Sequence, residues 1–190
     1  MGVMSETPES WFPLQTPRLL LRPFRDADLD DIHAYASVPE VSRFMEWGPN
    51  TPEDSRAFLD RALAQQSDWP RRHVGLAIER DGRVIGSIRL DLQGEKGAEA
   101  DLGYTLARDQ WRQGVATEAA AAMLDAAFAT LGLHRVWATC DVENVGSFGV
   151  MEKLGMRREG HFRQDKLVRG AWRDSFLYAI LAEEWDGRAN

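Results

Sequence analysis

The sequence predicts a mixed α/β fold in which a single sheet is flanked by helices. Two observations support this prediction. Residues 74–92 alternate between apolar and other side chains on either side of Asp81-Gly82, which is a strong signal for a β-hairpin. Residues 115–131 are instead rich in alanine over a helical length, as expected of a helix that packs into the body of a protein. One sheet with flanking helices accommodates both kinds of element.

The N-terminal third predicts one strand and two helices. Residues 18–23 favour a short strand, and residues 26–36 a helix whose first turn is crowded with aspartates, where the helix dipole favours anions. A second helix begins after Thr51, an N-cap candidate followed by Pro52. It is expected to end before Trp69.

The remaining elements follow the hairpin. Residues 100–106 predict the next strand, and the 115–131 helix ends at Gly132, which suits its C-terminal cap. Its only charges are Glu118 and Asp125, on one face, so a narrow stripe is expected to face water.

The C-terminal part predicts a strand, a short helix and a closing hairpin. The ranges are 136–142 for the strand, 146–154 for the helix, and 162–164 with 172–181 for the hairpin around Arg169-Gly170. We expect residues 1–13 to form a flexible leader, 14–185 a single domain and 186–190 a tail.

Composition excludes several classes of protein. A net charge of −7 and a pI near 5.2 argue against a nucleic-acid partner. The single cysteine, Cys140, cannot form an internal disulfide, and no run of 18 apolar residues predicts a membrane helix. The start lacks the basic and apolar regions of a signal peptide, so a cytoplasmic protein without membrane association is expected. The four histidines have no metal-like spacing, and no metal is expected.

An anion site is predicted where the alanine-rich helix begins. The segment Arg112-Gln113-Gly114-Val115-Ala116-Thr117 places a glycine beside unpaired N–H groups and the positive end of a helix dipole. Gly114 and Ala116 allow close approach of the backbone, and Arg112 adds a charge, which suits a pyrophosphate. The segment has neither the Walker nor the Rossmann glycine pattern. A plain helix start with one glycine in the preceding turn is the alternative.

The chain resembles the GNAT superfamily of N-acetyltransferases, specifically its branch of RimJ/RimL-type enzymes that acetylate the N-terminal alanine of ribosomal proteins. The resemblance covers nearly all of residues 14–185 in order. Its motifs are Thr16 to Arg22, Leu102-Gly103-Tyr104, Gln110 to Ala119, Asn144-Val145-Gly146-Ser147, Met151 to Met156, Gly170 to Asp174 and Glu184-Trp185. The resemblance implies a GNAT fold with a mixed, mostly antiparallel, twisted sheet whose splayed strands hold acyl-CoA. One motif position departs from the superfamily, because Trp111 stands where Arg or Gln is frequent.

The resemblance also implies roles for individual residues. Acetyl-CoA is the expected co-substrate, bound by the pyrophosphate loop, by the splayed strand and by the second signature. The implied cofactor-binding residues are Tyr104, Thr105, Leu106, Arg112, Gln113, Gly114, Val115, Ala116, Thr117, Asn144 and Ser147. Ser147 is the candidate to protonate or stabilise the leaving thiolate. Helix capping is the alternative for Asn144 and Ser147, and it can coexist with these roles.

The base that accepts the amine's proton is left open. Asp101 precedes the Leu102-Gly103-Tyr104 segment, Glu99 shares its strand face, and Glu46 precedes the second helix. Each can instead be an ordinary solvated carboxylate, and a water chain can replace all three. Trp47, next to Glu46, is expected near the acceptor.

Three functions stay open at this point. The first is acetyl transfer to a primary amine at a peptide or protein N-terminus, by direct attack in a ternary complex. The second is acetyl or succinyl transfer to a small amine such as an antibiotic, a polyamine or an amino acid. The third is a non-catalytic acyl-CoA-binding domain. The sequence also leaves a homodimer open.

Overall fold

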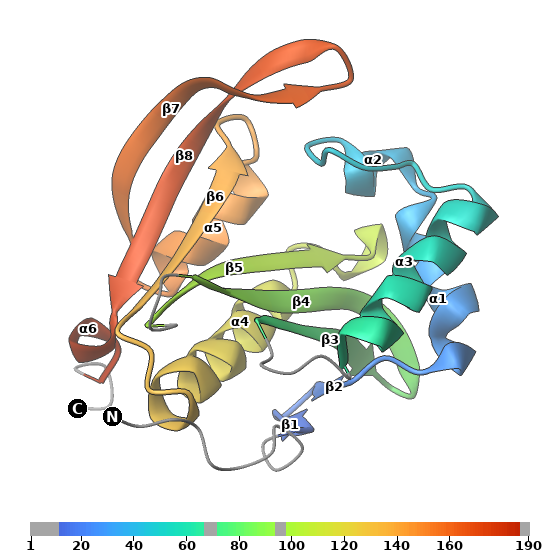
Figure 1. The fold of residues 1–190 in the computed structure, drawn as a ribbon, viewed down its shortest axis with the longest axis horizontal. Coiled ribbons are helices and arrows are strands. Elements are labelled where there is room, and N and C mark those ends of the chain that lie inside the picture. The colour runs from blue at the N-terminus through green and yellow to red at the C-terminus, as the bar shows by residue number, and fades with distance from the viewer. Residues whose placement is uncertain (1–11, 67–71, 94–97, 187–190) are drawn as a thin grey trace.

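A twisted eight-stranded sheet forms the centre of the chain (Figure 1). The computed structural model describes residues 12–66, 72–93 and 98–186, so most of the expected leader and tail lies outside it. The strand order is β1-β2-β3-β4-β5-β6-β8-β7, and only β5 and β6 pair in parallel. The mixed, mostly antiparallel sheet is therefore confirmed. The strands are β1 (Leu14–Gln15), β2 (Leu20–Arg22), β3 (His73–Arg80), β4 (Arg83–Gln93), β5 (Glu99–Leu106), β6 (Arg135–Asp141), β7 (Arg157–Val168) and β8 (Ala171–Leu181).

Helices cover both faces of this sheet (Figure 1). They are η2 (Asp26–Asp28), α1 (Leu29–Ala36), α2 (Pro39–Ser42), α3 (Pro52–Gln66), η3 (Arg108–Gln110), α4 (Val115–Asp125), η4 (Ala126–Thr130), α5 (Val145–Lys153) and α6 (Ala182–Asp186). The short helices α2 and α6 were not predicted, because four or five residues show too little periodicity. None of the described helices has the length and apolar character needed to cross a membrane.

The long alanine-rich helix differs from its prediction in two ways. It is α-helical only to Asp125, and a π-helical turn continues it to Thr130. Gly132, two residues later, has a φ of 63° and ends the helix in the expected left-handed conformation. Its two charged residues are also engaged by other segments. Glu118 accepts hydrogen bonds from Thr16 and Arg18, and Asp125 accepts one from the Trp185 indole. The predicted polar stripe thus joins this helix to segments near the start and the end of the described residues.

The two predicted hairpins are present. Asp81 and Gly82 have positive φ at the β3–β4 turn, as do Arg169 and Gly170 at the β7–β8 turn, which is the twist that tight hairpins require. The first strand of the closing hairpin is longer than predicted, because β7 begins at Arg157. Most of β7 is exposed on both faces, so it lacks the apolar alternation that reveals a strand.

The sheet separates two hydrophobic cores. Helices α4 and α5 pack on one face over Leu76, Ile88 and Leu102, while α1 and α3 pack on the other face against Ala77 and Val84. Strand β5 therefore directs its even-numbered side chains to the α4 face and its odd-numbered ones to the α1/α3 face. Both faces contribute to the site described next.

A buried ion cluster joins β2 to the segment before α1. The Arg22 guanidinium donates two hydrogen bonds of 2.8 Å to the Asp28 carboxylate and one of 2.5 Å to Glu79. Arg22 and Asp28 side chains are each 6% exposed. This buried cluster has a structural role.

Candidate active site

The loop before α4 has the geometry of an anion site. Gly114 is the N-cap of α4 with φ of 77°, and Arg112 is also left-handed, with φ of 60°. An added Cβ on Gly114 would meet nothing closer than an Arg18 nitrogen at 3.4 Å, so this backbone lies open. Because α4 starts here, its first N–H groups are not used within the helix. They can bind a phosphate.

A cleft of about 560 Å³ runs from this loop between β5 and α5. The predicted residues that line it are Tyr104, Thr105, Leu106, Arg112, Gly114, Val115, Ala116, Thr117, Asn144 and Ser147. The cationic side chains of Arg43, Arg112 and Lys153 also line it. All the predicted cofactor residues except Gln113 therefore line one cleft, and the cations and free helix N–H groups at its loop end fit a pyrophosphate.

Gln113 is the predicted residue that does not line the cleft. Its amide donates to the Asp109 carbonyl at 2.6 Å and accepts a hydrogen bond from Arg80, while its own carbonyl accepts one from Arg18. The side chain of Gln113 thus holds the loop in place through contacts outside the cleft.

The sheet opens where the cleft passes it. Strands β5 and β6 pair only from Glu99 to Asp101 and then diverge. The amide of Ala107 donates to the Ile85 carbonyl of β4, and backbone groups alternate along an antiparallel strand. The N–H groups of Tyr104 and Leu106 therefore point away from β4 into the gap. An extended ligand can pair with this free edge.

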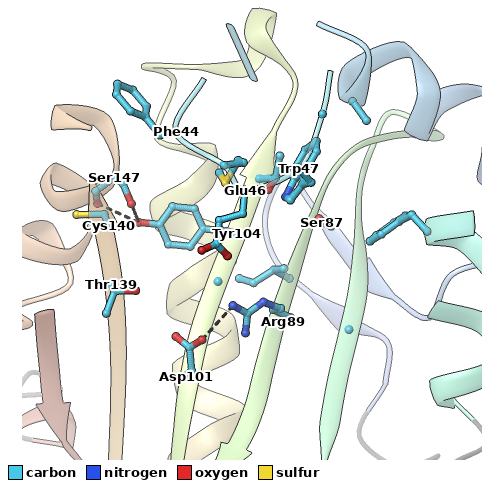
Figure 2. A pocket seen from close by; sticks show the side chains of 18 of the residues that line it. Phe44, Glu46, Trp47, Ser87, Arg89, Asp101, Tyr104, Thr139, Cys140 and Ser147 are labelled. Carbon is cyan, nitrogen blue, oxygen red and sulfur yellow. Dashed lines mark hydrogen bonds and ion pairs between the residues drawn. The ribbon is translucent and has the colours of Figure 1, made fainter. Parts of the chain in front are cut away.

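Asn144 and Ser147 lie at the start of α5, across the gap. The Asn144 side chain caps the helix by accepting from the Ser147 amide at 3.2 Å. The Tyr104 hydroxyl donates to the Ser147 carbonyl at 2.9 Å and lies 3.2 Å from Ser147 Oγ (Figure 2). Burial raises the pKa of Tyr104 well above its usual range. The phenol is therefore neutral and can orient the Ser147 hydroxyl.

Cys140 lies beside this pair without the properties of a nucleophile. Burial raises the pKa of its thiol to about 11, although the nearby Ser147 hydroxyl lowers it in part. A protonated thiol is a poor nucleophile at neutral pH.

A second cavity, of about 710 Å³, opens on the α1/α3 side of β5. Glu46 and Trp47, the predicted acceptor residues, line it together with Asp101. Figure 2 shows the Glu46 side chain pointing into this cavity above Asp101. The cleft and the cavity share the lining residues Phe44, Met45, Tyr104, Thr105, Asn144 and Ser147. The two spaces therefore meet at Tyr104 and Ser147.

These features can be compared with known proteins. Residues 18–157 match the Acetyltransferase (GNAT) domain family. The chain belongs to the GNAT acetyltransferase family. It is 34% identical to the uncharacterized N-acetyltransferase YnaD of Bacillus subtilis, over 91% of this chain and 99% of that one. A crystal structure of a GNAT-family acetyltransferase from Bacillus anthracis superposes with a TM-score of 0.80, at 32% identity over 90% of this chain and 99% of that one.

Other GNAT relatives have named ligands or substrates. Mycobacterium smegmatis RimJ, solved with CoA-disulfide, has a TM-score of 0.73 at 28% identity over 87% of this chain and 83% of that one. The spermidine N(1)-acetyltransferase of Escherichia coli K12 is 26% identical over 87% of each chain. The [ribosomal protein uS5]-alanine N-acetyltransferase of the same organism is 30% identical over 44% of this chain and 43% of that one. This GNAT protein is thus an acetyl-CoA-dependent N-acetyltransferase.

The carboxylates proposed as base in this GNAT protein have different surroundings. Asp101 lines the acceptor cavity and accepts a hydrogen bond of 3.0 Å from Arg89, which also pairs with Asp91 (Figure 2). Glu99 lines neither space, and Arg135 donates to its carboxylate at 3.4 Å. Glu46 forms no ion pair with the described part of the chain. The structure therefore places Asp101 and Glu46, but not Glu99, in the lining of the second cavity.

Two functional features of this GNAT chain were missed in the sequence. The Trp111 indole, at the departing motif position, donates to the Leu106 carbonyl at 3.0 Å and joins the loop to β5. The Arg169 guanidinium, at the tip of the β7–β8 hairpin, donates to the carbonyls of Ser42 and Gly48 at 2.9 Å each. It thereby fixes the segment that carries Glu46 and Trp47. Neither contact could be predicted, because neither forms part of a recognisable sequence motif. No group of three or more metal-ligating side chains gathers among the residues the structure describes.

Proposed function

We propose that this GNAT enzyme transfers an acetyl group from acetyl-CoA in the cleft directly to a primary amine in the acceptor cavity. The observation that carries the proposal is that the two spaces meet at Tyr104 and Ser147. A ternary complex needs such a junction, because the amine nitrogen must approach the thioester carbonyl to bonding distance.

Each chemical requirement of this reaction has a candidate group. The amine nitrogen attacks the carbonyl carbon, a C–N bond forms, and the C–S bond breaks to release CoA thiolate. The Tyr104 N–H points into the gap and can stabilise the oxyanion. The Ser147 hydroxyl, held by the Tyr104 phenol at 3.2 Å, can protonate the thiolate or hydrogen-bond to it. The proton lost by the amine goes to a carboxylate or to water.

We further propose that the acceptor is the α-amine of a peptide or protein N-terminus, as the RimJ/RimL resemblance and the uS5-alanine acetyltransferase relative suggest. The competing acceptor is a polyamine, the substrate of the spermidine relative. Charges in the cavity favour the first. Its lining holds four acids, Glu46, Asp54, Asp101 and Asp141, and four bases, Arg61, Arg89, Lys166 and Arg173. A polycation gains little from such a balance.

Ligand-induced stabilisation and turnover together test the proposal. Acetyl-CoA at 100 times its Kd should raise the free energy of unfolding by about 2.7 kcal/mol, because it binds only the folded state. Differential scanning fluorimetry detects this stabilisation as a rise in melting temperature. Release of free CoA in the presence of a panel of amines measures acetyl transfer. A shift without turnover of any amine would favour a non-catalytic acyl-CoA-binding domain. No shift at saturation would contradict the cleft assignment itself.

Removing the Ser147 hydroxyl should affect turnover more than binding. Ser147→Ala keeps the helix cap, because the cap uses the Ser147 amide and the Asn144 side chain. We expect kcat to fall about 10- to 100-fold with little change in the Kd for acetyl-CoA, since the hydroxyl matters most as the thiolate forms. Steady-state kinetics and calorimetry measure the two effects. Equal rates in variant and wild type would leave Ser147 a helix-start residue only.

The acceptor's proton gives a pH-dependent prediction. Amines have a pKa near 8 for an N-terminus and near 10 for lysine, so kcat/KM should rise with pH and level off as the neutral amine accumulates. We expect Asp101→Asn to lower the plateau about 100-fold. Glu99 lies on the same strand but lines neither space. Glu99→Gln should therefore change the plateau of kcat/KM less than twofold.

Two measurements separate the roles of these carboxylates. If Asp101 only holds Arg89 in place, Asp101→Asn will lower the melting temperature and leave the plateau of kcat/KM unchanged. If Glu46 is the base, Glu46→Gln will lower the plateau instead. Full activity of Asp101→Asn across the pH range would therefore remove it from the mechanism.

A further inference from the structure

A cluster of hydrogen-bond donors lies on the wall of the acceptor cavity formed by β6, β8 and β7. In the register of these strands Asp141 is opposite Ser175, and Arg173 is opposite Lys166. Lys166 extends back across β8, and its Nζ donates to Thr139 Oγ1 at 3.3 Å. Thr139, Ser175 and Lys166 all line the cavity. Three strands thus bring an ammonium and two hydroxyls to one wall.

The Ser175 hydroxyl has an unmet hydrogen-bonding requirement. Ser175 is 1% exposed, and its Oγ finds no partner among the described residues. Buried polar atoms in folded proteins are nearly always hydrogen-bonded, because leaving one unpaired costs free energy. Since this hydroxyl lines the cavity, a bound molecule there can supply the missing partner.

The charged groups on this wall differ in whether they form ion pairs. Asp141 and Glu143 each accept hydrogen bonds of 2.8 Å from Arg173, so these acids already have their counter-ion. Lys166 is half-buried and forms no ion pair with any described carboxylate. The Thr139 oxygen accepts from Lys166, which leaves its own proton to donate. An ammonium and two hydroxyl donors together suit an oxyanion.

We propose that the acceptor carries a carboxylate in addition to its amine, and that Lys166, Thr139 and Ser175 bind this carboxylate. The proposal rests on the proposed function, because it concerns the same cavity. Figure 2 shows Thr139 below Cys140 and Ser147, and Thr139 and Ser147 both line this cavity. A carboxylate held at Thr139 therefore leaves the amine end of the molecule free to face the junction. The carboxylate can belong to a free amino acid or to an acidic side chain near a peptide N-terminus.

Matched acceptors test this and separate the two sources. One arm compares free L-amino acids with their α-carboxamides. The other compares amidated peptides that begin Ala-Glu or Ala-Asp with those that begin Ala-Gln or Ala-Asn. In at least one of the two arms, kcat/KM should be about 10-fold or more higher for the acid than for the matching amide, as expected for hydrogen bonds to a charged group. Equal use of acid and amide in both arms would overturn the proposal.

Variants connect that preference to the cluster. Lys166→Met should raise the KM of the preferred acid about 10- to 100-fold and leave the matching amide and acetyl-CoA nearly unchanged. Ser175→Ala should act in the same direction with a smaller effect. Arg163→Met is the control, because Arg163 is exposed on the same strand and lines neither space. An equal loss for acid and amide in Lys166→Met would contradict the assignment.

A separate outcome distinguishes this proposal from the proposed function. If no amine in either arm is acetylated although acetyl-CoA binds, the proposed reaction fails. Calorimetric titration of the same acids and amides onto the CoA complex then tests the carboxylate site alone. Binding of an acid that is lost in Lys166→Met would support the site, and no Lys166-dependent binding would reject it.

Discussion

Replacing Gly114 by valine should weaken CoA binding about 100-fold or more while the chain stays folded. Gly114 has φ of 77° at the start of α4, where backbone N–H groups face the cleft. A branched side chain resists this conformation and occupies the space that a phosphate needs. Loss of one or two hydrogen bonds to a charged group accounts for an effect of this size. Calorimetric titration with CoA measures the affinity, and circular dichroism measures folding.

A second glycine provides a matched control for this experiment. Gly82, in the β3–β4 turn, has the same φ of 77°, and an added Cβ there meets nothing within 4 Å. Gly82→Val therefore introduces a similar backbone strain far from the cleft. It should lower the melting temperature to a similar extent and keep its affinity for CoA. Unchanged affinity in Gly114→Val would place the anion site elsewhere.

Replacing Arg22 by methionine should lower the free energy of unfolding by about 3–5 kcal/mol, because it leaves two carboxylates without their partner in a buried site. The Asp28 side chain is 6% exposed and that of Glu79 19%, so water can solvate neither fully. Arg83→Met is the control, since Arg83 also pairs with an acid, Asp31, but the Arg83 side chain is 73% exposed. Exposed pairs contribute about 1 kcal/mol or less. Urea unfolding measures both variants, and equal losses would show that the cluster is solvated.

The same cluster predicts how acid affects stability. Burial alone would raise the pKa of Asp28, but hydrogen bonds from Arg22 and the Arg25 amide outweigh this effect and hold the pKa below its usual value. A carboxylate whose pKa is depressed by folding stabilises the protein fully above its unfolded value, and this contribution disappears as pH falls through the folded value. Stability should therefore decline below about pH 4. Asp28→Asn, measured by urea unfolding at pH 7 and pH 3, should be less stable at pH 7 and decline less in acid.

The residues that line the cleft between β5 and α5 could be selected from the sequence because their features are local. Gly114 and the start of α4 are neighbours in the chain, and Asn144 caps the helix that follows it. A helix start and a glycine are recognisable from a few residues. The alternating runs around Asp81-Gly82 likewise fixed the central hairpin.

The second cavity was harder to predict from the sequence because its contacts join residues that are distant in the chain. Arg169 holds residues more than 120 positions earlier, and Lys166 reaches Thr139 from a strand that is mostly exposed. Before folding, both resemble ordinary solvated cations on a hairpin. Glu99 was selected for its place on the Asp101 strand face, but it projects beyond the cavity to Arg135. Strand alternation gives the face of a side chain but not its position along a cavity.

The divergence of β5 from β6 also bears on how this sheet avoids aggregation. Unpaired strand edges attract strands of other chains, and proteins usually shorten such edges or fill them with charge. The outer strands follow that rule, since β1 has two residues and β7 is rich in exposed charged residues. The free edge at Tyr104 lies instead in the middle of the molecule, with α5 across the gap. An edge enclosed in this way is open to a narrow, amide-containing chain and closed to a neighbouring sheet. The protein therefore keeps a reactive strand edge permanently available without exposing it to its own copies.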